Sequence, residues 1–102
     1  MKILRLRLEN FRNFAEETFS FTDGINILAG NNAQGKTNVL EAIYFFARGK
    51  SFRGATDGEM TAFGKEGYAC SIDYEKEDRE ESLFYSFSKR KGERIRKRNG
   101  VP

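Results

Sequence analysis

One glycine-rich segment constrains this chain more than any other feature of the sequence. It is Gly30-Asn31-Asn32-Ala33-Gln34-Gly35-Lys36-Thr37, and it fits the phosphate-loop pattern G-x-x-x-x-G-K-[ST] at every required position. Gly30 and Gly35 permit the backbone angles that turn successive N–H groups inward around an anion. Lys36 adds a mobile ammonium for the β- and γ-phosphates, and the Thr37 hydroxyl is a ligand for Mg²⁺. The segment therefore predicts a site for the phosphates of a nucleoside triphosphate, most simply Mg·ATP.

The flanks of this segment have the hydrophobic patterns that a phosphate loop requires. Residues 25–29 are nearly all apolar, which is typical of a strand buried on both faces. After Lys36 the spacing of apolar residues becomes helical. One apolar face is predicted, made of Val39, Leu40, Ile43, Phe46 and Ala47. We expect the helix to begin at about Lys36, with its positive end directed at the phosphates, and to stop at Gly49.

Alternating patterns predict antiparallel strands before this unit. Residues 3–9 alternate between apolar and polar side chains, which is typical of a half-buried strand. A turn over residues 10–14 is expected to lead into a second strand that carries Phe19 and Phe21. Because the connection is short, the two strands are expected to form an antiparallel pair.

The second half of the chain is predicted to be mostly strands. Residues 50–67 are punctuated by glycine and are expected to hold one short helical turn near residues 57–63. Three strands are predicted next, near residues 68–75, 81–87 and 93–98. Asn99-Gly100 is a strong type I′ hairpin signal. It leaves no room for a following strand, so the sequence looks cut at that point.

Charge is unevenly distributed in this half. The net charge is only +3, but residues 73–82 carry six acidic and two basic side chains, and residues 89–98 carry seven basic and one acidic. On an alternating strand Arg94, Arg96 and Arg98 share one face, where guanidinium groups at roughly 7 Å intervals could follow a phosphate backbone. The pattern predicts part of a duplex DNA-binding surface. A solvated strand beside an acidic turn would give the same pattern.

Composition limits the class of protein. At 102 residues the chain is one domain or part of one. Cys70 is the single cysteine, which excludes an internal disulfide and favours a reducing compartment. No apolar run approaches the roughly 18 residues that span a bilayer, and the N-terminus lacks the apolar region of a signal peptide. We therefore expect a cytoplasmic protein with no membrane partner.

Hydrolysis requires more than a phosphate loop. A P-loop hydrolase also needs an acidic residue in the Mg²⁺ shell and a group that orients or deprotonates the attacking water. Asp73 is the nearest acid after a strand-like run, but Ser71 interrupts that run and Tyr74 follows it, so a surface charge is the favoured interpretation. The chain contains no histidine. The sequence thus predicts nucleotide binding, with no catalytic residue and no hydrolysis by this chain alone.

Several segments, spread from one end of the chain to the other, carry a family resemblance. They are Ile3-Leu4-Arg5-Leu6-Arg7-Leu8 with Glu9-Asn10-Phe11-Arg12-Asn13-Phe14, Gly24-Ile25-Asn26-Ile27-Leu28, the whole phosphate loop, Asn38-Val39-Leu40-Glu41-Ala42-Ile43-Tyr44, Gly49-Lys50-Ser51-Phe52-Arg53 and Asn99-Gly100-Val101-Pro102. Together they resemble the RecF family of bacterial recombination-repair ATPases, most specifically over residues 24–53. One departure is Asn31, where the family often has an acidic residue or proline. A loop that binds through its backbone tolerates that change.

The resemblance implies a fold, partners and one further site residue. RecF is similar to ABC-type and SMC-type ATPases, so residues 1–102 would be the N-terminal part of an ATP-binding head. Such a head is an α/β fold with a strand–loop–helix unit and antiparallel strands. Arg12 would approach the nucleotide from the turn after the first strand, although the residues alone favour an exposed turn residue.

The same resemblance implies partners and a cellular role. Two heads would sandwich ATP in an ATP-dependent homodimer, and DNA and recombination-mediator proteins would be partners. The role would lie in DNA repair, recombination, replication and the SOS response. The acidic Mg²⁺ segment and the signature helix would follow residue 102.

Two other classes of protein remain open. A different P-loop ATPase of the coiled-coil type would carry a long heptad region in the sequence that follows. A nucleic-acid-binding β module would use the basic strand at residues 89–98 and leave the phosphate loop unused. DNA binding by that module would depend steeply on salt and be indifferent to ATP.

Overall fold

The computed structural model describes residues 2–21, 33–49 and 54–102 of the chain. Residues 1, 22–32 and 50–53 lie outside the described residues, as do the side chains of Ala33 and Gln34. The predicted strand at residues 25–29 and the first part of the phosphate loop, Gly30, Asn31 and Asn32, fall in that part of the chain.

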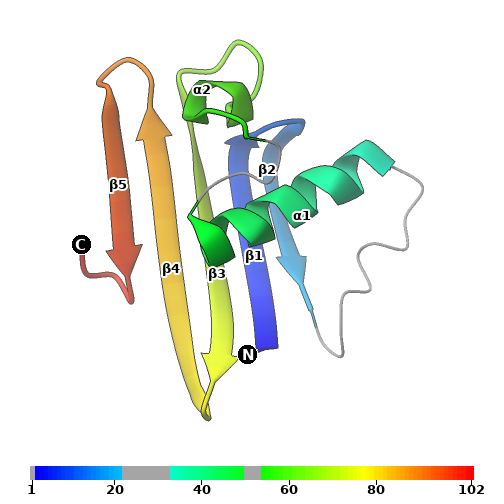
Figure 1. Cartoon of the computed structure of the whole chain (residues 1–102), viewed down its shortest axis with the longest axis vertical. Coiled ribbons are helices and arrows are strands. Elements are labelled where there is room, and N and C mark those ends of the chain that lie inside the picture. The colour runs from blue at the N-terminus through cyan, green and yellow to red at the C-terminus, as the bar shows by residue number, and fades with distance from the viewer. Residues whose placement is uncertain (1, 22–32, 50–53) are drawn as a thin grey trace.

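Five strands form one antiparallel sheet within the described residues (Figure 1). They are β1 (Lys2–Phe11), β2 (Phe14–Ser20), β3 (Gly67–Lys76), β4 (Arg79–Ser88) and β5 (Glu93–Arg98). Their order across the sheet is β2-β1-β3-β4-β5, so β2 and β5 are the two edges. The predicted antiparallel pair before the phosphate loop and the three predicted strands after it are confirmed.

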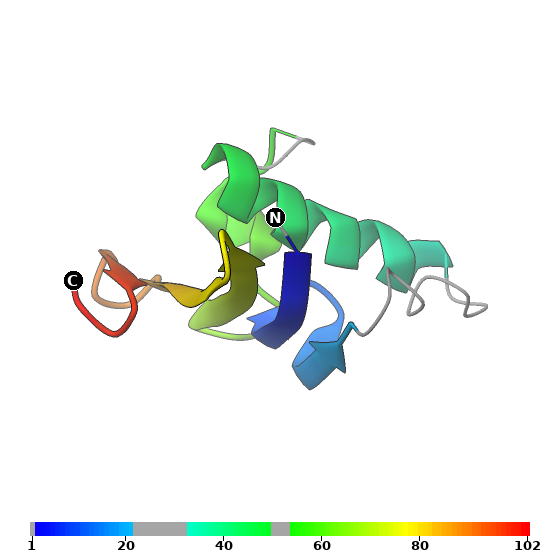
Figure 2. The ribbon, with the colours of Figure 1, turned by 90° about the horizontal axis from the view of Figure 1, so that it is seen from below.

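A long helix, α1 (Ala33–Arg48), lies across one face of this sheet (Figure 2). Successive side chains of a strand point to opposite faces of the sheet, so every second side chain lies on the face that carries α1. Leu6 and Leu8 of β1 and Cys70 of β3 are buried there, in one cluster with Phe45 of the helix. The opposite face of the sheet is more polar and carries Arg5, Arg7 and Asp73. Among the described residues, no helix is long and apolar enough to cross a membrane.

The buried face of α1 differs from the predicted one. Val39 is buried as expected, but Leu40 is 42% exposed and Ala47 is also exposed. The helix instead buries Asn38 and Glu41, which are 1% and 0% exposed. The prediction counted only apolar residues. It therefore missed two buried polar residues and placed the buried face of α1 incorrectly. These two polar residues are buried because they have partners in the β1–β2 turn, as described below.

The ends of the helices follow local rules. Helix α1 begins at Ala33, inside the glycine-rich segment and earlier than the predicted start at Lys36. It ends as predicted, because Gly49 has a φ of 78° and its N–H donates to the carbonyl of Phe45 at 2.7 Å. The predicted short turn near residues 57–63 is helix α2 (Asp57–Met60), held by a capping box between Thr56 and Glu59.

The predicted type I′ turn at Asn99-Gly100 is confirmed. Both residues have positive φ, 52° and 80°. Arg98 and Val101 close the turn, since the N–H of each donates to the carbonyl of the other at 2.8 and 3.0 Å. The Asn99 side chain also accepts from the backbone N–H of Ser82 at 2.8 Å. The turn is therefore attached to the neighbouring strand β4.

Candidate functional site

The N-terminal end of α1 holds the described half of the phosphate loop. Gly35 is buried there, Lys36 and Thr37 are half-buried, and the first turn of the helix contains no acidic residue. The helix dipole favours an anion at such an end. An ammonium and a hydroxyl at this end fit a Mg-bound triphosphate, with Lys36 for the phosphates and Thr37 for the Mg²⁺.

A second cation reaches the same helix from the β1–β2 turn. Arg12 points its guanidinium at Glu41, with Nε donating to Oε1 and Nη2 to Oε2, each at 2.8 Å. The Arg12 side chain is 22% exposed and the Glu41 side chain is fully buried. These hydrogen bonds from Arg12 to Glu41 raise the pKa of Arg12, against the opposing effect of burial. Arg12 is thus a permanently charged group fixed beside α1.

The β1–β2 turn is held at several further points. Asn38 of α1 donates from Nδ2 to the Oδ1 of Asn13 at 2.6 Å, while its own Oδ1 is buried and has no hydrogen-bond partner among the described residues. On the other side, the N–H of Arg12 donates to the carbonyl of Met60 at 2.8 Å. The N–H of Ala62 donates to the carbonyl of Asn10 at 2.7 Å. Helix α1 and the segment at α2 therefore fix this turn between them.

Sequence reasoning did not single out Glu41 or Asn38 as site residues. The signal that could have found them is their spacing on the predicted helix. Residues 37, 38 and 41 lie within one turn of each other, and residues three and four apart share a helix face. A polar residue on a face that is otherwise buried needs a partner. Here the partners are Arg12 and Asn13, which the sequence placed in a turn.

Asp73 lies on the face of the sheet opposite α1. Its carboxylate accepts from Arg5 Nε at 2.9 Å and from Ser82 Oγ at 2.7 Å. Arg5 in turn also pairs with Glu80 at 2.5 Å. The interpretation of Asp73 as a surface charge is confirmed, and this position does not suit a ligand for Mg²⁺ at the end of α1. Among the described residues, no group of three or more acidic, histidine or cysteine side chains could hold a metal ion.

The three arginines of β5 share one face of the sheet, as predicted. The residues paired with them on strand β4 are Phe87 for Arg94, Tyr85 for Arg96 and Leu83 for Arg98. This is the face that carries α1, since Tyr85 packs edge-on against Phe45 with ring centroids 4.9 Å apart. The structure does not bring these arginines to Lys36 or Arg12, because β5 is the far edge of the sheet from the β1–β2 turn (Figure 1).

Two of these arginines already have carboxylate partners. Arg94 donates from Nε to Asp57 Oδ2 at 2.6 Å, and Arg98 donates from Nη2 to Glu81 Oε1 at 2.9 Å. Arg96 lies over the ring of Tyr85, with Cζ 5.3 Å from the ring centroid. Asp57 also accepts from the hydroxyls of Tyr68 at 2.7 Å and Tyr85 at 3.1 Å. Burial alone would raise the pKa of Asp57, but the hydrogen bonds from Arg94, Tyr68 and Tyr85 outweigh it, so this pKa is lowered.

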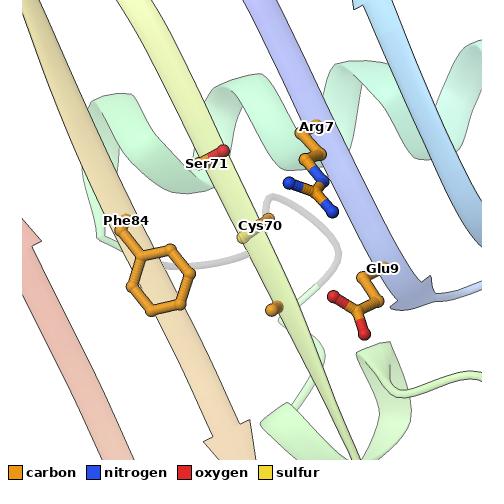
Figure 3. A pocket seen from close by; sticks show the side chains of 6 residues that line it. Arg7, Glu9, Cys70, Ser71 and Phe84 are labelled. Atoms are coloured by element: carbon orange, nitrogen blue, oxygen red, sulfur yellow. The ribbon is translucent and has the colours of Figure 1, made fainter.

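A shallow hollow of about 150 Å³ lies on the face of the sheet away from α1 (Figure 3). It is lined by Arg7, Glu9, Ala69, Cys70, Ser71 and Phe84. Small side chains on β3 make the hollow, between Phe84 on one side and Arg7 and Glu9 on the other. Burial raises the pKa of the Cys70 thiol to about 12, so it stays protonated at neutral pH. This thiol belongs to the buried cluster on the α1 side of the sheet, so it is not an accessible nucleophile.

Comparisons with known proteins agree with this arrangement. The family described as AAA ATPase domain matches residues 1–99. The DNA replication and repair protein RecF of Acetivibrio thermocellus is 43% identical over 75 residues, which is 74% of this chain and 20% of that protein. The RecF protein of Halalkalibacterium halodurans is 55% identical over 60 residues, which is 59% of this chain and 16% of that protein. The chain thus spans about one fifth of the length of the relatives it matches.

Solved structures give the same result. A structure described as the recombination mediator protein RecF-ATPrS in the RecFOR pathway has a TM-score of 0.84 at 29% identity, covering 97% of this chain and 27% of that chain. The SMC head domain of Thermotoga maritima has a TM-score of 0.70 at 24% identity, covering 100% of this chain and 38% of that chain, which shows a shared fold. The predicted α/β class is confirmed, and the chain belongs to the AAA ATPase domain family, where the relatives it matches are RecF proteins.

Proposed function

We propose that this chain is the ATP-binding, N-terminal part of a RecF-type ATPase head that acts in DNA repair and recombination. The observation that carries the proposal is the end of α1, where Lys36 and Thr37 lie in a helix start free of acidic residues. Arg12 adds a fixed guanidinium beside the same helix. Related RecF structures are described as complexes with ATP and ATPrS, which supports ATP as the nucleotide.

In this proposal the site residues have separate roles. The backbone N–H groups from Gly30 to Gly35, through Asn31, Asn32, Ala33 and Gln34, surround the phosphates. Lys36 would neutralise the β- and γ-phosphates, and the Thr37 hydroxyl would hold Mg²⁺, which would supply positive charge against the phosphates. Arg12 approaches the nucleotide from the β1–β2 turn.

The proposal extends to assembly and partners at the level of the whole relatives. In this proposal the chain binds the nucleotide, and a second head in an ATP-dependent homodimer would complete the site for hydrolysis. The names of the relatives and of the matched structures favour DNA and recombination-mediator proteins as partners. Such a protein would work in the cytoplasm.

A DNA contact at β5 is the second part of the proposal. Arg94, Arg96 and Arg98 lie exposed on one face of an edge strand whose six residues are all exposed. Among the described residues, Arg96 has no carboxylate partner, so it is the arginine that we expect to meet a phosphate first. The ion pairs of Arg94 and Arg98 would have to open for these two to contribute.

The test of the nucleotide proposal is calorimetric titration of Mg·ATP into the wild-type chain and Lys36→Ala. Lys36 is half-buried at the helix start, so alanine there removes a phosphate ligand and leaves the core unchanged. We expect affinity to fall at least about tenfold, the loss of one charge-assisted contact. Lys65→Ala, a lysine outside the site, is the matched control. Equal affinities of wild type and Lys36→Ala would overturn the proposal.

A further inference from the structure

The buried carboxylate of Glu41 is the feature that the proposed function leaves unexplained. Its side chain has no exposure to solvent, and it lies on the sheet-facing side of α1. Burying a charge is costly, and replacing a whole buried ion pair by apolar residues of similar size often gives an equally stable or more stable protein. Stability is therefore a weak reason for an acid here. A role in fixing a cation is a stronger one.

The geometry of the Arg12–Glu41 pair fixes the guanidinium in position and orientation. Two parallel hydrogen bonds of 2.8 Å hold Nε and Nη2, a fork-to-fork arrangement that fixes the plane of the group. A guanidinium has five N–H donors, so Arg12 keeps donors on Nη1 and Nη2 after it has satisfied Glu41. The Arg12 side chain is 22% exposed, so its outer part reaches solvent.

The backbone of Arg12 is also held in an unfavourable conformation. Its φ is 53°, in the left-handed region that side chains other than glycine seldom adopt. The hydrogen bonds from Arg12 N–H to the Met60 carbonyl and from Ala62 N–H to the Asn10 carbonyl hold the turn in that shape. A conformation of this kind persists where the surroundings over-determine it, and these hydrogen bonds keep the Arg12 backbone in place.

The position of Glu41 relative to the phosphate loop completes the argument. Glu41 follows Thr37 by one helical turn, so the two lie on the same side of α1 and about 6 Å apart along its axis. A guanidinium held at Glu41 therefore lies beside the residues assigned to the phosphates and Mg²⁺. Because the pair is neutral overall, it acts by placing donors at a defined point and adds little long-range attraction.

We propose that Glu41 is a positioning residue for the nucleotide site, which fixes the Arg12 guanidinium so that its remaining donors face the bound nucleotide. The inference rests on the proposed function. It predicts whether Glu41→Gln strengthens or weakens the binding of Mg·ATP. Glu41→Gln removes a negative charge from the neighbourhood of the phosphates, which on charge alone would strengthen binding. Positioning predicts the opposite, a weaker binding of Mg·ATP by about tenfold, since Arg12 is no longer held.

The test is a double-variant cycle measured by calorimetric titration of Mg·ATP. The four proteins are wild type, Glu41→Gln, Arg12→Lys and the double variant, and circular dichroism checks their folds. Lysine keeps the charge at residue 12 but cannot form the fork. We expect each single variant to lose about tenfold in affinity, and Glu41→Gln to cause no further loss in the Arg12→Lys background. Glu81→Gln removes one negative charge from β4, away from the β1–β2 turn, and is the matched control, expected to bind like wild type.

The outcomes separate this inference from the proposed function. Wild type that binds no Mg·ATP would overturn both. Wild type that binds, with Glu41→Gln equal or tighter, would overturn the positioning role and leave the nucleotide proposal standing. An equal loss from Glu41→Gln in both backgrounds would show that Glu41 acts without Arg12, which also overturns it. If Glu41→Gln does not fold, Arg12→Lys decides alone, and binding equal to wild type would overturn the inference.

Discussion

An arginine–carboxylate ion pair lies near each of the two edges of the sheet, but the two pairs differ in burial. At the β1–β2 turn, Arg12 is 22% exposed and its partner Glu41 is 0% exposed. At the β5 edge, Arg94 is 55% exposed and its partner Asp57 is 13% exposed. Both carboxylates lie on helices, Glu41 on α1 and Asp57 on α2, whereas Arg12 lies in the β1–β2 turn and Arg94 on strand β5. The difference in burial separates a pair that organises the interior beside the candidate site from a pair that attaches an edge strand.

The largest effect that tests this comparison is on stability at the buried end. Arg12→Ala removes the guanidinium that faces the buried Glu41 carboxylate. We expect a loss of about 3–5 kcal/mol in the free energy of unfolding, the usual cost of breaking a buried pair from one side. Urea unfolding measures it. The double variant Arg12→Ala/Glu41→Gln is expected to regain most of the loss, because it leaves no buried charge. A single-variant loss below about 1 kcal/mol would mean that this pair behaves like a surface pair.

A smaller effect is expected at the β5 edge, and it depends on pH. Asp57 accepts hydrogen bonds from Arg94, Tyr68 and Tyr85, and its pKa in the folded chain lies below the ordinary value of 3.8. A carboxylate with a lowered pKa stabilises the fold above its unfolded pKa, and this contribution is lost as pH falls through the folded pKa. Asp57→Asn is therefore expected to cost about 1–3 kcal/mol at pH 7, and less below about pH 4.

Urea unfolding of wild type and Asp57→Asn at neutral and acid pH checks this. The pKa values of Glu59 and Glu81 are also lowered, so the wild-type curve alone contains their contributions as well. The difference between the two proteins isolates Asp57, since the other carboxylates are common to both. A difference that stays constant between pH 7 and about pH 3 would show that the charge of Asp57 does not stabilise the fold.

The two ends also differ in how far the sequence could predict them. Alternation and turn chemistry predicted the strands at the β5 edge and the type I′ turn at Asn99, because these features depend on neighbours in sequence. Alternation also placed Arg94, Arg96 and Arg98 on one face, as the structure shows. It could not show that Asp57, far along the chain, accepts from Arg94.

At the other end, the phosphate-loop pattern located the start of α1 within a few residues. The Arg12–Glu41 contact joins residues 29 positions apart, and a hydrophobic pattern contains no information on it. For the same reason the predicted buried face of α1 was wrong. Glu41 and Asn38 are buried because they have polar partners, which a hydrophobic pattern does not detect. Residues such as these, which break the local pattern of a buried face, are where function is expected to lie.

The smallest expected effect separates the three arginines of β5 from one another. Each phosphate that a protein neutralises on duplex DNA adds about 0.9 to the slope of log affinity against log salt. Arg94 and Arg98 are engaged by Asp57 and Glu81, whereas Arg96 lies over Tyr85, a contact that leaves its donors available to a phosphate. Arg96→Ala is therefore expected to lower the slope by about 0.9 and the affinity by less than about tenfold. Arg94→Ala and Arg98→Ala are expected to change the slope and the affinity less, because the ion pairs of Arg94 and Arg98 compete with DNA. Fluorescence anisotropy on a short duplex across a salt series measures all three, beside the triple alanine variant. If the triple variant keeps the wild-type affinity and slope, β5 is an ordinary charged edge, and the contrast between the two ends of the sheet is one of stability alone.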